Sequence, residues 1–146
     1  ARRLVAAGVR LGPLVCYEDM LPSAVRAAAR GADMLLCASN DGWLGPAAAR
    51  RHLAATRLAA VETGRFALRP ALSGISAVID PLGRAIWTAP WIDGDLHPDA
   101  PGVVGIVEVP LRRPRLCGAL VSPWIAAAAC VVLLAGGWRR ARGSAR

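Results

Sequence analysis

The chain has 146 residues, which is long enough for one domain with its own hydrophobic core. Its formal net charge is +8, but seven of the eighteen basic residues follow residue 111 and all ten acidic residues precede it. Residues 1–111 are therefore nearly neutral, and they contain no basic stripe or nucleic-acid-binding motif, which argues against nucleic acid as a partner. Every basic residue is arginine, so the sequence contains no lysine.

Two short apolar segments at the start predict neighbouring strands. They are Leu4–Val9 and Leu11–Cys16, with the bend between them near Arg10. The chain opens abruptly at Ala1, without an initiator methionine or a signal peptide. We therefore expect it to be the C-terminal part of a longer protein.

The second segment leads into Cys16, a polar turn and then a helix. Pro22 and the preceding Asp19 are typical helix-start signals, and they predict a helix over Pro22–Arg30 that Gly31 ends. Cys16 is thus expected at a strand-to-helix junction near the positive end of a helix, where a thiolate is favoured. This is the geometry of a nucleophile elbow. A small core residue at a strand end is the alternative.

The next apolar run, Asp33–Cys37, predicts a second buried strand, parallel to the first because a helix connects them. The loop Ala38–Gly45 should then leave the sheet at the same edge as Cys16, the edge at which open α/β sheets bind ligands. Three residues of that loop are expected beside the cysteine: Asn40, Asp41 and Trp43.

A longer helix is predicted over Pro46–Arg65, with its buried stripe formed by Ala54, Leu58 and Val61. Four further strands are predicted after it: Ala67–Arg69, Ile75–Ile79, Ala85–Thr88 and Val103–Val109. A turn is expected at Asp80–Gly83 and a surface loop at Trp91–Gly102.

The C-terminal segment Leu116–Trp138 has twenty-three residues without a charge and lies between two groups of arginines. Such a segment is long enough to cross a bilayer, and Trp124 and Trp138 suit interfacial positions. A buried core helix is the alternative. We expect two parts, an α/β domain over residues 1–111 and a transmembrane helix with arginine-rich flanks over residues 112–146.

The four cysteines are too widely spaced for a zinc knuckle or a redox pair. Cys37 ends an apolar strand and is expected in the core, and no disulfide framework is indicated. His52 has no aspartate or cysteine at ligand spacing. We predict neither a metal nor a cofactor.

Four blocks of sequence share the order and spacing of one family. They are VCYED at Val15–Asp19, SNDGWLG at Ser39–Gly45, His52 with TRLAAVETGR at Thr56–Arg65, and SGISAVIDPLG at Ser73–Gly83. The series resembles the nitrilase superfamily, in particular its membrane-bound branch, the apolipoprotein N-acyltransferases. The resemblance implies an α/β fold, the C-terminal half of a nitrilase-like α-β-β-α sandwich followed by one transmembrane helix.

The resemblance implies a ping-pong acyl transfer. Cys16 would accept a fatty acyl chain from a membrane phospholipid as a thioester, then pass it to the N-terminal diacylglyceryl-cysteine of an apolipoprotein. Phospholipid, apolipoprotein and the membrane are thus the implied partners. The implied location is the bacterial inner membrane, with a multi-pass full-length protein, a periplasmic catalytic domain and a cytoplasmic arginine-rich tail.

Cys16, Tyr17 and Glu18 are the catalytic candidates. By resemblance, Glu18 matches a functionally important glutamate of the family, although a carboxylate near a helix N-terminus is also stabilising without any function. The backbone N–H of Tyr17 is a candidate donor to the oxyanion, since the amide after an elbow nucleophile often has that role. The tyrosine ring itself could equally serve packing.

Asn40, Asp41 and Trp43 match the family's active-site loop and are the substrate-binding candidates. Trp43 would flank the entrance for the acyl chain, whereas an ordinary Asn-Asp-Gly turn explains the first two residues almost as well. His52 is expected on the helix surface or as a supporting group of the site. Three residues resemble structural ion-pair positions: Arg57, Glu62 and Arg65.

The resemblance also shows what the chain lacks. The family's triad is Glu-Lys-Cys, with the glutamate and lysine upstream of the cysteine strand, and a chain without lysine cannot hold all of it. Either the first half is missing or the protein is an inactive relative, and truncation is favoured; the fragment alone is expected to be inactive. Ala71–Ser73 also lacks the family's asparagine before Gly74. The alternatives are a nitrilase-type amidase for small amides and a non-catalytic membrane-anchored module.

Overall fold

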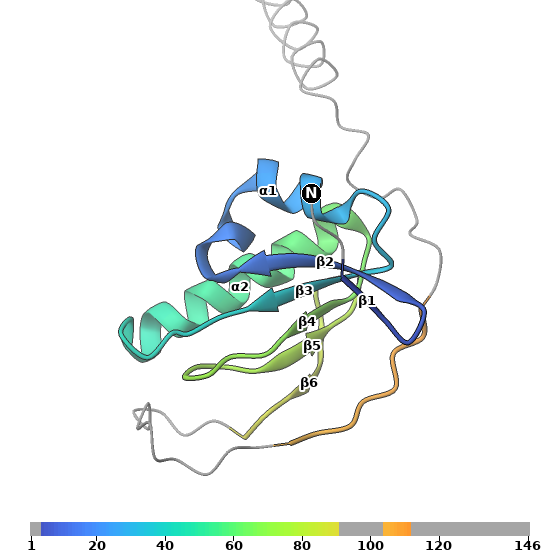
Figure 1. Ribbon diagram of the computed structural model, residues 1–146. Coiled ribbons are helices and arrows are strands. Elements are labelled where there is room, and N and C mark those ends of the chain that lie inside the picture. The colour runs from blue at the N-terminus through green and yellow to red at the C-terminus, as the bar shows by residue number, and fades with distance from the viewer. Residues whose placement is uncertain (1–3, 91–103, 112–146) are drawn as a thin grey trace, which may run out of the picture.

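The computed structural model describes residues 4–90 and 104–111, which form a mixed α/β layer structure (Figure 1). In this part of the chain, six strands form one sheet in the order β1-β2-β3-β4-β5-β6. The strands are β1 (Leu4–Ala6), β2 (Val9–Val15), β3 (Met34–Ala38), β4 (Ala67–Arg69), β5 (Ala77–Ile79) and β6 (Ala85–Thr88). The helices are the 3₁₀ helix η1 (Cys16–Met20), α1 (Pro22–Ala29) and α2 (Gly45–Thr63).

The centre of the sheet is parallel, as the β-α-β pattern predicts. β2 pairs with β3 from Leu11 opposite Met34 to Val15 opposite Ala38, and β4 is parallel to β3. The pairs β1–β2, β4–β5 and β5–β6 are antiparallel. Because β2 and β3 end in register, the segments that follow them leave the same edge of the sheet side by side.

The first hairpin turns two residues earlier than expected. Ala7 and Gly8 have φ values of +48° and +79°, the left-handed pair that a tight two-residue hairpin needs. The predicted bend near Arg10 is wrong, since that residue lies inside β2. Gly12 is required in β2 for another reason: a Cβ there would collide with the backbone carbonyl of Ala28, so α1 passes directly over this strand.

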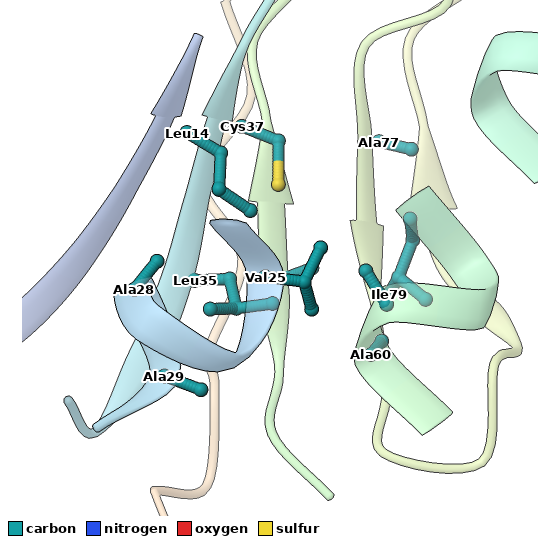
Figure 2. Close-up of a cluster of buried hydrophobic side chains, with 11 residues drawn as sticks. Leu14, Val25, Ala28, Ala29, Leu35, Cys37, Ala60, Ala77 and Ile79 are labelled. Atoms are coloured by element: carbon teal, nitrogen blue, oxygen red, sulfur yellow. The ribbon is translucent and has the colours of Figure 1, made fainter. Parts of the chain in front are cut away.

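Both α-helices cover one face of the sheet and form the core with it (Figure 2). The buried cluster takes side chains from α1, α2 and four strands: Leu14, Val25, Ala28, Ala29, Leu35, Cys37, Ala59, Ala60, Ala67, Ala77 and Ile79. Most of the helical contributions are alanines, which let the helices approach the strands closely. This packing places α2 against β4 and against η1, the element that begins at Cys16.

The buried stripe of α2 differs from the prediction. Ala54 and Val61 are exposed and Leu58 is 70% exposed, so the predicted stripe is wrong. The residues that face the sheet are small or polar: Ala49, His52, Thr56, Ala59, Ala60 and Thr63. Hydropathy placed leucine and valine inside, whereas this helix buries polar groups that find hydrogen-bond partners there.

The predicted strand Val103–Val109 is not present in its described part. Residues 104–111 form no strand with any other described segment, and the side chains of Val104 and Ile106 are almost fully exposed. Alternating apolar residues suit a strand, but a strand also needs a partner edge. The segment does touch the sheet, since a Cβ at Gly105 would collide with the ring of Trp87.

Two predicted segments lie outside the described residues. They are the surface loop Trp91–Gly102 and the membrane span Leu116–Trp138. Among residues 4–90 and 104–111, no helix has the length and apolarity that a bilayer crossing requires.

Candidate active site

Cys16 lies at the junction where β2 ends and η1 begins, at the edge shared by β2 and β3. The predicted strand-to-helix junction is thus confirmed, although the helix that begins there is the short η1, and α1 starts at Pro22. The backbone of Cys16 has φ +50°, the left-handed region that residues other than glycine seldom occupy. Its side chain is partly exposed and its thiol is free. Backbone strain of this kind is common where a structure holds a reactive group in place.

Glu18 stabilises the turn that carries the cysteine. Its Oε2 accepts a 2.8 Å hydrogen bond from the backbone N–H of Val15, one residue before Cys16. The side chain therefore folds back over the start of η1, as a glutamate three residues after a helix cap commonly does. Tyr17, which lies between Cys16 and Glu18 in the sequence, is 63% exposed.

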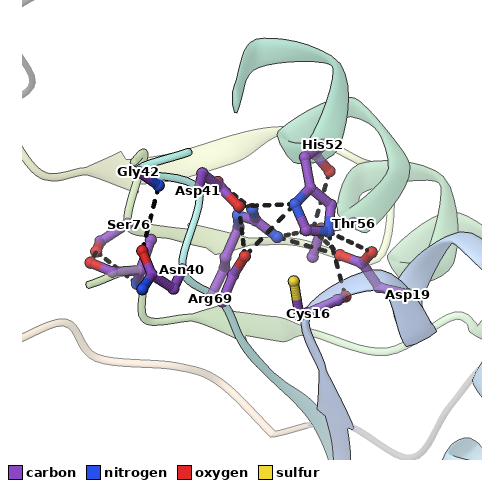
Figure 3. A network of polar contacts seen from close by, with 11 residues as sticks. Cys16, Asp19, Asn40, Asp41, Gly42, His52, Thr56, Arg69 and Ser76 are labelled. Carbon is purple, nitrogen blue, oxygen red and sulfur yellow. Dashed lines mark hydrogen bonds and ion pairs between the residues drawn. The ribbon is translucent and has the colours of Figure 1, made fainter. Parts of the chain in front are cut away.

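Asp19 has a different role from the one predicted. The residue that precedes α1 is Leu21, and no side chain caps that helix, so the interpretation of Asp19 as a helix-start signal is wrong. Its buried carboxylate points toward α2 and β4 (Figure 3). Oδ1 lies 2.9 Å from His52 Nε2, and Oδ2 accepts hydrogen bonds from Thr56 Oγ1 (2.5 Å) and Arg69 Nη1 (3.1 Å).

Asp41 lies on the other side of the same histidine. Its Oδ1 accepts hydrogen bonds from Ser39 Oγ (2.5 Å) and His52 Nδ1 (2.8 Å), and its Oδ2 accepts one from Arg69 Nη2 (2.7 Å). Burial opposes ionisation of this carboxyl, but the Ser39 hydrogen bond, the charge of Arg69 and the His52 hydrogen bond outweigh burial and lower the pKa of Asp41. The carboxylate is fully buried and occupied, so it lies behind the site and does not face a substrate.

His52 joins these groups to the cysteine. It is 1% exposed, so the expectation of a helix-surface position is wrong. In addition to the two carboxylates, Nε2 lies 3.2 Å from the carbonyl oxygen of Cys16. We call Asp19, Asp41, His52 and Arg69 the buried charged cluster; it connects η1, the loop after β3, α2 and β4 directly behind Cys16.

Asn40 and Trp43 remain on the outside of the loop after β3. Asn40 Oδ1 accepts a 3.2 Å hydrogen bond from the backbone N–H of Gly42, so it forms the expected asparagine turn. Trp43 is 77% exposed. Of the three residues predicted in this loop, the structure therefore leaves Asn40 and Trp43 accessible and buries Asp41.

The loop that lacks the family's asparagine is held by its backbone. Ser39 donates its N–H to Pro70 and accepts from the N–H of Leu72, at 3.0 and 2.9 Å, and Asp41 donates its N–H to Ser73 at 2.7 Å. Gly74, with φ +142°, passes so close to Asp41 that a Cβ there would lie 2.6 Å from its Oδ2. The two loops therefore pack backbone to backbone, without a side-chain amide.

Of the three residues expected at structural ion-pair positions, Glu62 forms an ion pair, whereas the two arginines bond to backbone carbonyls. Glu62 pairs with Arg26 at 2.7 Å, Arg57 Nε donates to the carbonyl of Gly83 at 2.6 Å, and Arg65 Nε donates to that of Ala32 at 2.9 Å. Cys37 is buried in the core as predicted. Burial, followed by the nearby charge of Asp19, raises the pKa of its thiol to about 12, so Cys37 stays protonated and unreactive.

The sequence interpretation missed Arg69, Thr56 and Ser39 as members of this site. An arginine in a short strand between apolar neighbours was the available signal for Arg69, because a buried arginine needs carboxylate partners. His52 and Thr56 lie four residues apart on one helical face, a spacing that could have placed them together.

Comparison with known proteins agrees with the sequence resemblance. The model of the carbon-nitrogen hydrolase family matches residues 3–113. The apolipoprotein N-acyltransferase of Gloeobacter violaceus is 44% identical over 89 residues, which cover 60% of this chain and 16% of that protein. The apolipoprotein N-acyltransferase of Sinorhizobium medicae is 47% identical over 77 residues, covering 52% of this chain and 14% of that protein. The chain thus spans about a sixth of the length of the curated relatives it matches.

A solved structure supports the fold. The crystal structure of a carbon-nitrogen hydrolase from Helicobacter pylori matches with a TM-score of 0.54 and 20% identity, over 60% of this chain and 38% of that one. At this identity the match concerns the fold alone. Since the family model covers most of the sequence and the described fold is of the nitrilase type, this chain belongs to the carbon-nitrogen hydrolase family.

Proposed function

We propose that this chain carries the nucleophile of an apolipoprotein N-acyltransferase, with Cys16 as the residue that is acylated. The observation that carries the proposal is the backbone at Cys16: a partly exposed free thiol held at φ +50° between β2 and η1. A core cysteine at a strand end needs no such conformation. The similarity to curated apolipoprotein N-acyltransferases gives the substrate class.

The proposed reaction has two halves. In the first, a base removes the thiol proton and Sγ of Cys16 attacks the ester carbon of a phospholipid; the C–S bond forms, the ester C–O bond breaks, and the lysophospholipid oxygen takes the proton. In the second, the α-amino group of a diacylglyceryl-cysteine attacks the thioester; the C–N bond forms, the C–S bond breaks, and the amine proton returns to sulfur through the base. In both halves the backbone N–H of Tyr17 is the proposed donor to the oxyanion.

Exposed apolar side chains support an acyl substrate. They lie on the last residue of β2 and on the segments that follow β2, β3 and β4: Val15, Tyr17, Met20, Leu21, Trp43 and Leu72. The loops of this group are in contact, because the backbone of Leu72 bonds to that of Ser39. Apolar side chains around a nucleophile suit an acyl chain. In this proposal Trp43 flanks the entrance of the chain, Asn40 shapes the loop that presents it, and the site faces the bilayer from the periplasmic side.

The resemblance places the glutamate base and the lysine of the triad upstream of the cysteine strand, and this chain contains no lysine. We therefore expect the 146-residue chain alone to form no thioester, because one cationic oxyanion partner is missing. Turnover by the isolated chain would contradict this expectation.

Intact-mass measurement tests the proposed function. The full-length protein that carries this chain, incubated with a phospholipid of defined acyl composition, should gain the mass of one acyl chain that hydroxylamine removes. Cys16→Ala should gain none. Cys37→Ala is the matched control and should be acylated like the unchanged protein, because that thiol is buried in the core.

Addition of a diacylglyceryl-cysteine peptide should discharge the thioester and yield the N-acylated peptide. Release of free fatty acid at the same rate with or without peptide would favour a hydrolase. Absence of any adduct on the full-length protein would overturn the proposal.

A further inference from the structure

The carbonyl of Cys16 and the N–H of Tyr17 belong to one peptide group, and the described part of the chain contains no cis peptide bond. In a planar trans peptide, the C=O and N–H bonds point in opposite directions. Whatever fixes the direction of the Cys16 carbonyl therefore also fixes the direction of the Tyr17 N–H. In this structure the carbonyl is directed at His52 Nε2, 3.2 Å away.

His52 contacts three oxygen atoms through its two ring nitrogens. Its Nδ1 lies 2.8 Å from Asp41 Oδ1, and its Nε2 lies 2.9 Å from Asp19 Oδ1 as well as 3.2 Å from the Cys16 carbonyl. A carbonyl oxygen only accepts hydrogen bonds, so the contact with Cys16 uses a proton on Nε2. Arg69 supplies the positive charge that both buried carboxylates require.

The other contacts of the cluster hold the ring in one orientation. Arg69 binds Asp19 through Nη1 and Asp41 through Nη2, and Thr56 donates a further hydrogen bond to Asp19. Both carboxylates are fully buried. The imidazole ring is thereby held from two sides, with Nε2 directed at the peptide that follows the nucleophile (Figure 3).

We propose that His52 is a positioning residue of the acyl transfer: it binds the Cys16 carbonyl and thereby aims the Tyr17 N–H at the oxyanion. The inference rests on the proposed function. Glu18 binds the N–H of Val15 and so holds the chain one residue before the left-handed Cys16. His52 does not touch the acyl group in this account, and it acts only through the peptide.

Two substitutions of His52 test the contacts of its two ring nitrogens separately. The amide nitrogen of asparagine can take the place of Nδ1 and that of glutamine the place of Nε2. His52→Asn should keep a bond toward Asp41 and lose the one to the Cys16 carbonyl, whereas His52→Gln should keep the latter. We expect His52→Asn to lower kcat for thioester formation by about 10²-fold, and His52→Gln by less than about tenfold, because only the former releases an oxyanion donor.

Alkylation of Cys16 by iodoacetamide is the second readout. This displacement forms no oxyanion, so in both variants its rate should stay within about threefold of that of the unchanged protein. Leu58→Asn, on the exposed face of the same helix, is the control for an asparagine in α2 and should leave both rates unchanged. All measurements use the full-length protein in detergent.

The outcomes distinguish the two proposals. If the unchanged protein forms no thioester, the proposed function fails, whatever His52 does. If it does form one, equal rates for His52→Asn and His52→Gln, or a parallel loss of acylation and alkylation, would reduce His52 to a structural residue and overturn the positioning role alone.

Discussion

The carboxylate of Glu18 accepts a 2.8 Å hydrogen bond from the backbone N–H of Val15. The glutamate two residues after the cysteine is thus, in this structure, a backbone acceptor that closes the turn carrying the nucleophile. This hydrogen bond stabilises the turn whether or not Glu18 also has a role in catalysis.

Glu18→Ala should lower the free energy of unfolding by about 1 kcal/mol, because the N–H of Val15 loses its partner. Glu18→Gln keeps an acceptor oxygen and should cost less than half as much. Urea unfolding of the chain followed by circular dichroism measures both. If the two variants were equally destabilised, the contact would not depend on the acceptor.

Cys16→Gly should be more stable than Cys16→Ala by about 1 kcal/mol, although neither can form a thioester. The reason is the φ of +50°, which glycine adopts without the steric cost that a Cβ imposes. Thermal unfolding of the two variants, compared side by side, tests this directly. A glycine variant that melts below the alanine variant would argue that the junction carries no strain.

Arg69→Met should lower the free energy of unfolding by about 3–5 kcal/mol, because Asp19 and Asp41 would remain buried without their shared cation. Arg84 offers the matched control. It also pairs with an aspartate, Asp80, but its side chain is 70% exposed, so Arg84→Met should cost under about 1 kcal/mol. Chemical denaturation measures both, and similar losses would mean that burial of the cluster does not matter.

Acid should weaken the contact between β2 and the start of β3. Hydrogen bonds from the side chain and backbone of Arg10 lower the pKa of Asp33 to about 2. Because the folded-state pKa lies below the ordinary value, this stabilisation is complete above about pH 4 and is lost as the pH falls toward 2.

Arg10→Met should therefore raise the pKa of Asp33 toward its ordinary value and flatten the loss of stability between pH 4 and pH 2. NMR titration of the Asp33 carboxyl carbon gives the first result, and melting temperatures across this pH range give the second. The backbone hydrogen bond from residue 10 persists in the variant, so part of the shift should remain. An unchanged titration curve would exclude the Arg10 side chain as the cause.

The sequence alone predicted most of the frame around Cys16. Short apolar runs separated by a helix-start proline and a helix-ending glycine are local signals, and they located β2, α1 and β3 to within one or two residues. The parallel pairing of β2 and β3 followed from the connecting helix. The turn at Asp80–Gly83 is also confirmed, because Gly83 donates its N–H to Asp80.

The buried charged cluster could not be predicted in the same way. Its four members come from η1, a loop, α2 and β4. They can be buried because their side chains pair with one another, and such pairing between distant segments leaves no local sequence pattern. The amphipathic pattern therefore assigned Leu58 to the core, and His52 was expected either on the helix surface or as a supporting group of the site. The structure exposes Leu58 and buries His52, which leaves only the second alternative for the histidine. For Val103–Val109 the alternation was real, but pairing depends on a neighbouring edge that a local pattern cannot supply.

The in-register ending of β2 and β3 limits how this protein can change. Val15 lies opposite Ala38, so Cys16 and Ser39 leave the sheet as neighbours. One residue inserted within β3 would shift everything after it by about 3.3 Å and turn each side chain to the opposite face. Asp41 would then miss His52, whereas an insertion near Gly31, before the strands pair, would leave that distance untouched. In related sequences, insertions and deletions should therefore occur between α1 and β3 and should be absent between Met34 and Asp41.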